Sequence, residues 1–242
     1  MPHEQMDVQQ VADYLHLDSR GVVKLASRGQ IPCRKVGGKF VFTKGEVDHW
    51  VEASMHQLGG DRLAKIEKGV SRHHGFDHEE MLVCPLIPPA PHGVAVPLFA
   101  KTREAAIRSL VDLAEQADLV NGKDELTDEI RKREDLCSTA LMPDVALPHP
   151  RHPLPYGIAA SFVVVGLTAS GIPFGAPDGK LTRLFFLICC KDDRTHLHVL
   201  ARLARILDNP QAVGRMLSAG SGDELRAMLE EREKAVLEGL TG

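Results

Sequence analysis

The sequence predicts an α/β protein, an α+β sandwich built on a mixed sheet, preceded by a small unit of three helices and a β-hairpin. Apolar stretches at 159–168 and 181–190 alternate with amphipathic helical stretches, and such alternation favours a sheet covered by helices. Residues 6–55 show short helical patterns and a Gly-Gly hairpin instead. We therefore expect a small N-terminal domain, a linker and a larger α/β domain, at residues 1–55, 56–80 and 81–242.

The composition is that of a soluble globular protein without a membrane anchor. Of the 242 residues, 43% are apolar and 26% are charged, and the net charge of −4 argues against polyanion binding by the whole molecule. No run approaches about 18 apolar residues, and the polar N-terminus lacks the apolar core of a signal peptide. The five cysteines form no CxxC pair, so we expect reduced thiols in a cytoplasmic protein that does not insert into membranes.

Residues 6–55 have the element order of a winged helix-turn-helix. Asp7 can cap a first helix, and Gly29 can end a second. Gly37-Gly38 lies between two alternating stretches, which is typical of a β-hairpin, and Thr43 can cap a third helix. We therefore expect two helices joined by a tight turn, then a hairpin wing, then a closing helix.

Four segments within residues 6–51 carry a family resemblance. They are Val8-Gln-Gln-Val-Ala-Asp-Tyr-Leu, Ser19-Arg-Gly-Val-Val-Lys, Gly29-Gln-Ile-Pro-Cys-Arg-Lys-Val-Gly-Gly-Lys-Phe and Thr43-Lys-Gly-Glu-Val-Asp-His-Trp. In this order they resemble the excisionase and MerR-like helix-turn-helix family. The resemblance implies duplex DNA as a partner.

The placement of charge in this domain points the same way. All seven basic side chains of residues 1–60 fall within 19–45, where no acid occurs. That span would meet a major groove and its flanking phosphates; the alternative is a solvated basic face without a ligand. One such domain is small, so we expect a homo-oligomer or tandem sites. The candidate DNA-binding residues are Arg20, Lys24, Arg28, Arg34, Lys35 and Lys39.

The elements of the larger domain are predicted from apolar periodicity and from proline content. Met81–Pro85 is expected to be a short strand, and the proline-rich stretch 85–97 to be extended rather than helical. Helices are expected at 103–117, 124–134, 195–207, 211–217 and 222–237, and further strands at 145–148, 159–168 and 181–190.

The segment Val145-Ala-Leu-Pro-His149-Pro-Arg-His152-Pro places a histidine on a stiff corner just past a buried strand. Proline on both sides bars a helix and fixes the direction of His149. The alternatives are a rigid surface turn and a metal site shared with His152, which lacks a third ligand. A zinc site among His73, His74 and His78 of the linker also lacks correctly spaced partners. We expect no metal and no cofactor.

Five motifs of the larger domain, that segment among them, occur in this order: Ala100-Lys-Thr-Arg-Glu-Ala-Ala-Ile, Arg133-Glu-Asp-Leu-Cys-Ser-Thr, Val145-Ala-Leu-Pro-His-Pro-Arg, Phe174-Gly-Ala-Pro-Asp-Gly and Thr195-His-Leu-His-Val-Leu. They resemble the type-2 EIIA domain of the sugar phosphotransferase system, the fructose, mannitol and nitrogen-regulatory kind. By position, the resemblance implies that His149 accepts a phosphoryl group from a phosphohistidine carrier protein. It also implies that His196, which opens a helix, lies beside His149.

Other side chains near His149 in sequence could stabilise a phosphoryl group. Ser138 and Thr139 could donate hydroxyl protons, and Arg151 could neutralise charge. The family usually has glycines where this sequence has Ala140, Met142 and Asp144, and glycine lets backbone N–H groups approach a phosphoryl group. Their absence bears on how efficiently the site transfers phosphate.

Three functional hypotheses follow from the two resemblances. The first is a transcriptional regulator in which phosphorylation of His149 reports carbon or nitrogen status to the DNA-binding domain. The second is a plain EIIA component that passes phosphate to a sugar permease subunit. The third is an interaction module that has lost its transfer chemistry, which the missing glycines allow.

Overall fold

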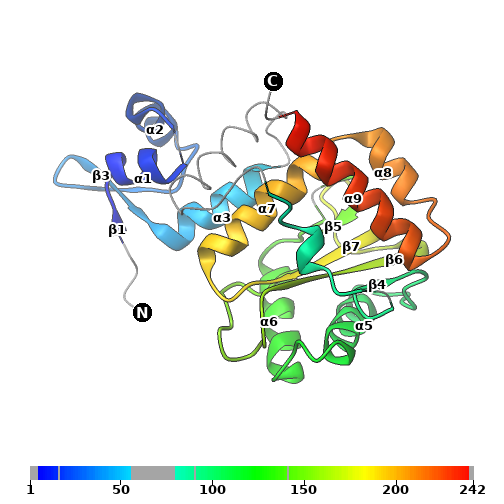
Figure 1. The fold of residues 1–242 in the computed structure, drawn as a ribbon. Helices are drawn as coiled ribbons and strands as arrows, with labels where there is room; N and C mark the ends of the chain where they lie inside the picture. The colour runs from blue at the N-terminus through cyan, green and yellow to red at the C-terminus, as the bar shows by residue number, and fades with distance from the viewer. Residues whose placement is uncertain (1–4, 16, 56–79, 90, 141, 240–242) are drawn as a thin grey trace. The chain divides into compact units, whose positions relative to one another are not determined.

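The computed structural model describes residues 5–15, 17–55, 80–89, 91–140 and 142–239. The chain divides into two compact units, Met1–Glu80 and Met81–Gly242 (Figure 1). The expected linker histidines His73, His74 and His78 lie outside the described residues. In the described part of the chain, no helix has both the length and the apolar character needed to cross a membrane.

The first unit is a small helical domain with a three-stranded antiparallel sheet in the order β1-β3-β2. Its core contains Val11, Val22, Ile31 and Phe42, all at most 2% exposed. The elements are β1 (Gln5–Met6), α1 (Val8–Leu15), α2 (Ser19–Ser27), β2 (Arg34–Val36), β3 (Lys39–Thr43) and α3 (Lys44–Met55).

Local sequence signals account for the ends of these elements. Asp7 and Gln10 form a reciprocal capping box at the start of α1, with each side chain accepting the other's backbone N–H at 2.8 Å. Gly29 follows α2 with a φ of +66°, which ends the helix without the strain a Cβ would add. Gly37 and Gly38, with φ of +57° and +82°, turn the β2–β3 hairpin. The expected winged arrangement is present.

The second unit is an α/β sandwich around a four-stranded mixed sheet in the order β4-β6-β7-β5. β6 and β7 are antiparallel, while β4 pairs parallel with β6 and β5 pairs parallel with β7. The strands are β4 (Val94–Ala95), β5 (Asp144–Ala146), β6 (Phe162–Ile172) and β7 (Thr182–Cys189); the helices are η1 (Cys84–Leu86, 3₁₀), α5 (Arg103–Gln116), α6 (Lys123–Leu136), α7 (Asp193–Leu207), α8 (Pro210–Met216) and α9 (Gly222–Glu238).

Helices cover both faces of this sheet. Figure 1 shows α5 and α6 on one face and α7 and α9 on the other. The central strands are apolar on both sides, as in Val163–Val165 and Phe185–Leu187, because each face packs against helices. The sandwich with a mixed sheet, expected from the alternation of strands and helices, is confirmed.

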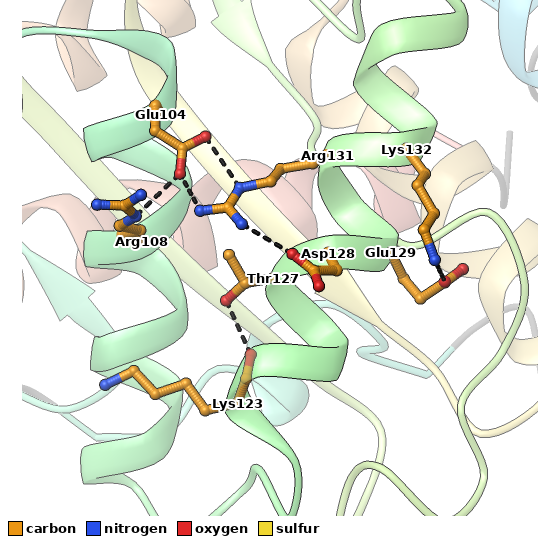
Figure 2. Close-up of polar contacts among 8 residues, drawn as sticks. All are labelled: Glu104, Arg108, Lys123, Thr127, Asp128, Glu129, Arg131 and Lys132. Atoms are coloured by element: carbon orange, nitrogen blue, oxygen red, sulfur yellow. Dashed lines mark hydrogen bonds and ion pairs between the residues drawn. The ribbon is translucent and has the colours of Figure 1, made fainter.

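Ion pairs on the surface of the second unit join α5 to α6. Arg131 on α6 donates from Nε to Glu104 on α5 at 3.0 Å, and Arg108 binds the same carboxylate (Figure 2). Arg103 near the start of α5 pairs with Asp135 in the last turn of α6 at 2.9 Å. These exposed pairs contribute little energy singly, but together they fix the two helices against each other.

The expected strand at Met81–Pro85 is wrong, and the proline-rich stretch after it is not extended throughout. Residues Cys84–Leu86 form a 3₁₀ turn, with Pro85 in its first positions, where a missing N–H costs nothing. The carboxylate of Glu233 on α9 accepts the N–H groups of Leu82, Val83 and Cys84, each at 2.8 Å. A tertiary partner thus replaces the strand neighbour that the apolar pattern seemed to require.

Candidate functional site

His149 lies three residues past the end of β5 and is 3% exposed. The carbonyl oxygen of Pro148 accepts the N–H of Ile188 on β7 at 3.0 Å, which continues the strand pairing up to the histidine. With Pro148 and Pro150 on either side, the backbone here has little freedom. The histidine is therefore held at the edge of the sheet by the strand on one side and by proline geometry on both.

The two ring nitrogens of His149 have different partners. Nδ1 lies 2.7 Å from the carbonyl oxygen of Leu147, and Nε2 accepts the Nε–H of Arg133 at 3.2 Å. A carbonyl oxygen only accepts, so Nδ1 carries the proton and Nε2 presents its lone pair. The arrangement selects the tautomer with a proton on Nδ1 and a lone pair on Nε2.

His196 approaches His149 from the first turn of α7. The two ring centroids are 4.9 Å apart and the rings are tilted by 54°. Asp192 caps this helix end: its side chain accepts from Thr195 N at 2.9 Å, and its carbonyl accepts from His196 N at 3.1 Å. Because these amides are already bound, α7 contributes the imidazole of His196 to the surroundings of His149.

The three other candidates for stabilising a phosphoryl group, Ser138, Thr139 and Arg151, lie in different surroundings. The Ser138 hydroxyl donates to the carbonyl of Phe174 at 3.0 Å, and the Thr139 hydroxyl donates to Glu134. Arg151 is exposed on the loop after His149. Each hydroxyl proton is therefore already engaged within the protein, and a role for any of the three in binding phosphate remains a prediction.

Of the three positions where the family usually has glycine, only position 144 has a left-handed backbone conformation. Asp144 has a φ of +62°, a left-handed conformation that aspartate tolerates better than most side chains. Among the described non-glycine residues, positive φ occurs only there and at Asp118. Position 144 thus keeps the conformation that a glycine would adopt, despite the change of residue type.

Arg133 is a site residue to which sequence reasoning assigned no role. It is 2% exposed, and its Nη1 also donates to the carbonyl oxygen of Cys137 at 2.9 Å. The motif Arg133-Glu-Asp-Leu-Cys-Ser-Thr contains it, and a charged residue on the inward face of a helix is the one signal that could have singled it out. Among the described residues there is no cluster of three or more side chains suited to a metal ion.

The six candidate DNA-binding side chains form an exposed set on α2, on the residue that follows it and on the hairpin. Arg20 and Lys24 extend from α2, with Arg28 at its C-cap, and the hairpin contributes the rest. All six are exposed: Arg20, Lys24, Arg28, Arg34, Lys35 and Lys39. Lys35 also lies over the Phe40 ring at 5.3 Å, which restrains it on the hairpin.

Comparison with protein families decides the assignment. Residues 91–232 match the EIIA type 2 family of the phosphoenolpyruvate-dependent sugar phosphotransferase system. The chain belongs to this family. Residues 6–55 match a helix-turn-helix domain, so an EIIA domain is fused to a helix-turn-helix domain in one chain, as the two resemblances predicted.

Individual relatives agree with the family. The fructose-specific EIIA component of Haloferax volcanii is 30% identical over 132 residues, 54% of this chain and 84% of that protein. The fructose-specific EIIABC component of Bacillus subtilis is 25% identical over 59% of this chain, but the match covers only 22% of that longer protein. The nitrogen regulatory protein IIA-Ntr of Neisseria meningitidis shares the EIIA fold, with a TM-score of 0.55 and 24% identity, covering 62% of this chain and 99% of that one.

Proposed function

We propose that this EIIA protein accepts a phosphoryl group on Nε2 of His149 from a phosphohistidine on a phosphocarrier protein. The observation that carries the proposal is the state of the His149 ring, with the proton held on Nδ1 by Leu147 and the lone pair on Nε2. A neutral imidazole oriented in this way is a good nucleophile toward phosphorus. Family membership supports the reaction class.

In the transfer step the Nε2 lone pair forms a bond to phosphorus, and the bond between phosphorus and the donor's imidazole nitrogen breaks. The donor imidazole leaves with that electron pair, and Nδ1 of His149 keeps its proton. Arg133, which binds Nε2 in the resting site, must release the lone pair. Its guanidinium is then placed to meet the phosphoryl oxygens, where positive charge stabilises the transferring group.

His196 is proposed to stabilise the phosphoryl group rather than to accept it, because its ring stands beside that of His149 at a centroid distance of 4.9 Å. We expect His196→Ala to slow transfer by about 10²–10³-fold, the usual cost of one stabilising contact. Quench-flow measurement of label transfer gives the rate. A rate equal to that of the unaltered protein would remove His196 from the mechanism.

We further propose that the helix-turn-helix domain binds duplex DNA and makes the chain a transcriptional regulator. The exposed basic set on α2 and the hairpin supports this role. A phosphoryl group adds up to two negative charges, but beyond about 8 Å such charge is screened at physiological salt. Regulation therefore requires docking between the domains or a homo-oligomer whose geometry changes with phosphorylation.

The charge on α2 gives a prediction for DNA binding. We expect Lys24→Ala with Arg28→Ala to weaken binding to any duplex and to lower the slope of log K against log salt by about 2, since each lost phosphate contact removes about 0.9. Fluorescence anisotropy over a salt series measures both. Lys132→Ala with Lys234→Ala, which removes two exposed lysines of the other unit, serves as control and should leave the slope unchanged.

The proposed function is tested by incubating the full chain with a phosphorylated phosphocarrier protein and measuring acid-labile phosphate. Label on the chain, together with a shift in affinity for one operator-bearing fragment, supports a regulator. Label that passes on to a sugar-specific IIB domain without affecting DNA binding supports a permease component. Absence of label leaves the silent interaction module.

A further inference from the structure

Two consecutive residues in the last turn of α6 approach the site in different ways. Arg133 binds Nε2 of His149 directly. Glu134 makes no such contact and points instead to the loop that precedes β5. Both residues are 2% exposed. Burying a carboxylate costs folding free energy unless the carboxylate is hydrogen-bonded or paired with a positive charge.

The contacts of Glu134 converge on Thr139. Its carboxylate accepts the Thr139 backbone N–H at 3.1 Å and also accepts the hydroxyl proton of that residue. Burial raises the pKa of the Glu134 carboxyl, and the hydrogen bonds from Thr139 oppose that rise. With both donors of one residue bound to the same carboxylate, the Thr139 peptide has a fixed position and orientation.

Thr139 in turn holds the strand end that carries the histidine. Its carbonyl oxygen accepts the N–H of Leu147 at 3.3 Å, and the carbonyl oxygen of Leu147 lies 2.7 Å from Nδ1 of His149. The series Glu134, Thr139, Leu147 and His149 therefore runs from α6 to the ring nitrogen that must keep its proton. α6 itself is fixed against α5 by Arg131 and Glu104 (Figure 2).

We propose that Glu134 is a positioning residue for phosphoryl transfer, which fixes the Leu147 carbonyl through Thr139 and so holds His149 in the Nδ1–H tautomer. Arg133 and Glu134 together then address both ring nitrogens from one helical turn, the first directly and the second through the loop. The inference rests on the proposed acceptor role of His149. Its consequence for the ring can be measured without any transfer.

The test compares Glu134→Ala and Glu134→Gln with Asp135→Asn in the full chain. Asp135 is the next carboxylate along α6, but its side chain is 66% exposed and pairs with Arg103. Ring ¹⁵N chemical shifts of His149 report the tautomer directly. We expect a protonated Nδ1 and an unprotonated Nε2 in the unaltered protein and in Asp135→Asn, and averaged shifts in Glu134→Ala.

Transfer kinetics give the second readout. We expect kcat to fall about 10–100-fold in Glu134→Ala, which is the usual loss when a residue that orients a reacting group is removed. The KM for the phosphocarrier protein should not change. Glu134→Gln should recover part of the rate, because its amide oxygen still accepts from Thr139. A higher KM with an unchanged kcat would indicate a merely structural role for Glu134. Failure of Glu134→Gln to recover any of the rate would indicate the same.

Unchanged ring shifts and unchanged kcat in a folded Glu134→Ala protein would overturn the proposal. If that variant does not fold, Glu134→Gln and Thr139→Val, which remove the charge and one donor respectively, carry the same two readouts. If the unaltered protein takes no phosphate, the acceptor role of His149 fails. In that case the ¹⁵N shifts alone decide whether Glu134 orients the ring.

Discussion

Replacing His149 with alanine is expected to abolish all acid-labile phosphate on the chain after incubation with a phosphorylated phosphocarrier protein. The imidazole of His149 has its Nδ1 fixed by a backbone carbonyl, and its Nε2 lone pair faces a guanidinium. His196 cannot take over the role simply by its nearness, because the nucleophile must be held in line with the phosphorus–nitrogen bond that breaks. Phosphorus radiolabel and intact-protein mass measured at alkaline pH follow the modification.

The matched control for this change is His152→Ala. His152 lies on the same proline-rich loop, three residues along, but is exposed, so its removal should leave the label in place. Label that survives in His149→Ala and disappears in His152→Ala would show that the acceptor is His152 and not His149. A circular dichroism spectrum equal to that of the unaltered protein confirms that His149→Ala has folded.

Much of the fold follows from local signals in the sequence. Gly37-Gly38 gives the hairpin turn, Thr102 caps α5 by accepting Ala105 N–H, and the apolar stretches at 159–168 and 181–190 overlap β6 and β7. These features depend on contacts between neighbours in sequence or on burial of whole strands. The ends of β6 shift by three and four residues from the prediction because strand ends depend on pairing partners, which the sequence does not display.

The site was predicted only in part. Proline on both sides of His149 marks it as a residue of fixed direction, and the motif of α7 brings His196 to its side. Arg133 and Glu134 could not be placed in the same way. Arg133 reaches His149 only in the folded domain, and Glu134 turns inward to bind Thr139, just past the end of α6. Whether a charged residue on a helix faces solvent or a neighbouring loop is decided by tertiary packing.

The segment before the EIIA domain shows most clearly what sequence patterns cannot supply. Glu233 on α9 and Arg202 on α7 are both fully buried and form an ion pair at 3.2 Å. The same carboxylate accepts three successive N–H groups, those of residues 82–84. Glu233 and this segment lie just outside the family match at 91–232. Burial, together with the nearby Glu233 carboxylate, raises the pKa of the Cys84 thiol and keeps it protonated.

The second large effect is expected at this carboxylate. Glu233→Ala removes the acceptor that now binds the three N–H groups of residues 82–84 and the guanidinium of Arg202, and most of these groups are buried. Removing one partner of a buried ion pair usually costs about 3–5 kcal/mol of unfolding free energy. We expect a loss of that size in the second unit, and a smaller one for Glu233→Gln, which keeps an acceptor oxygen in place.

Because the chain contains two units, the loss is best measured by native-state hydrogen exchange of the β6 and β7 amides, which report the unfolding free energy of the second unit alone. Glu231→Ala is the matched control: it lies two residues away on α9, in an exposed pair with Arg215, and should change that free energy by less than about 0.5 kcal/mol. Exchange at Leu82, Val83 and Cys84 should accelerate most in Glu233→Ala. Equal free energies for Glu233→Ala and Glu231→Ala would show that the carboxylate does not hold this segment to the domain.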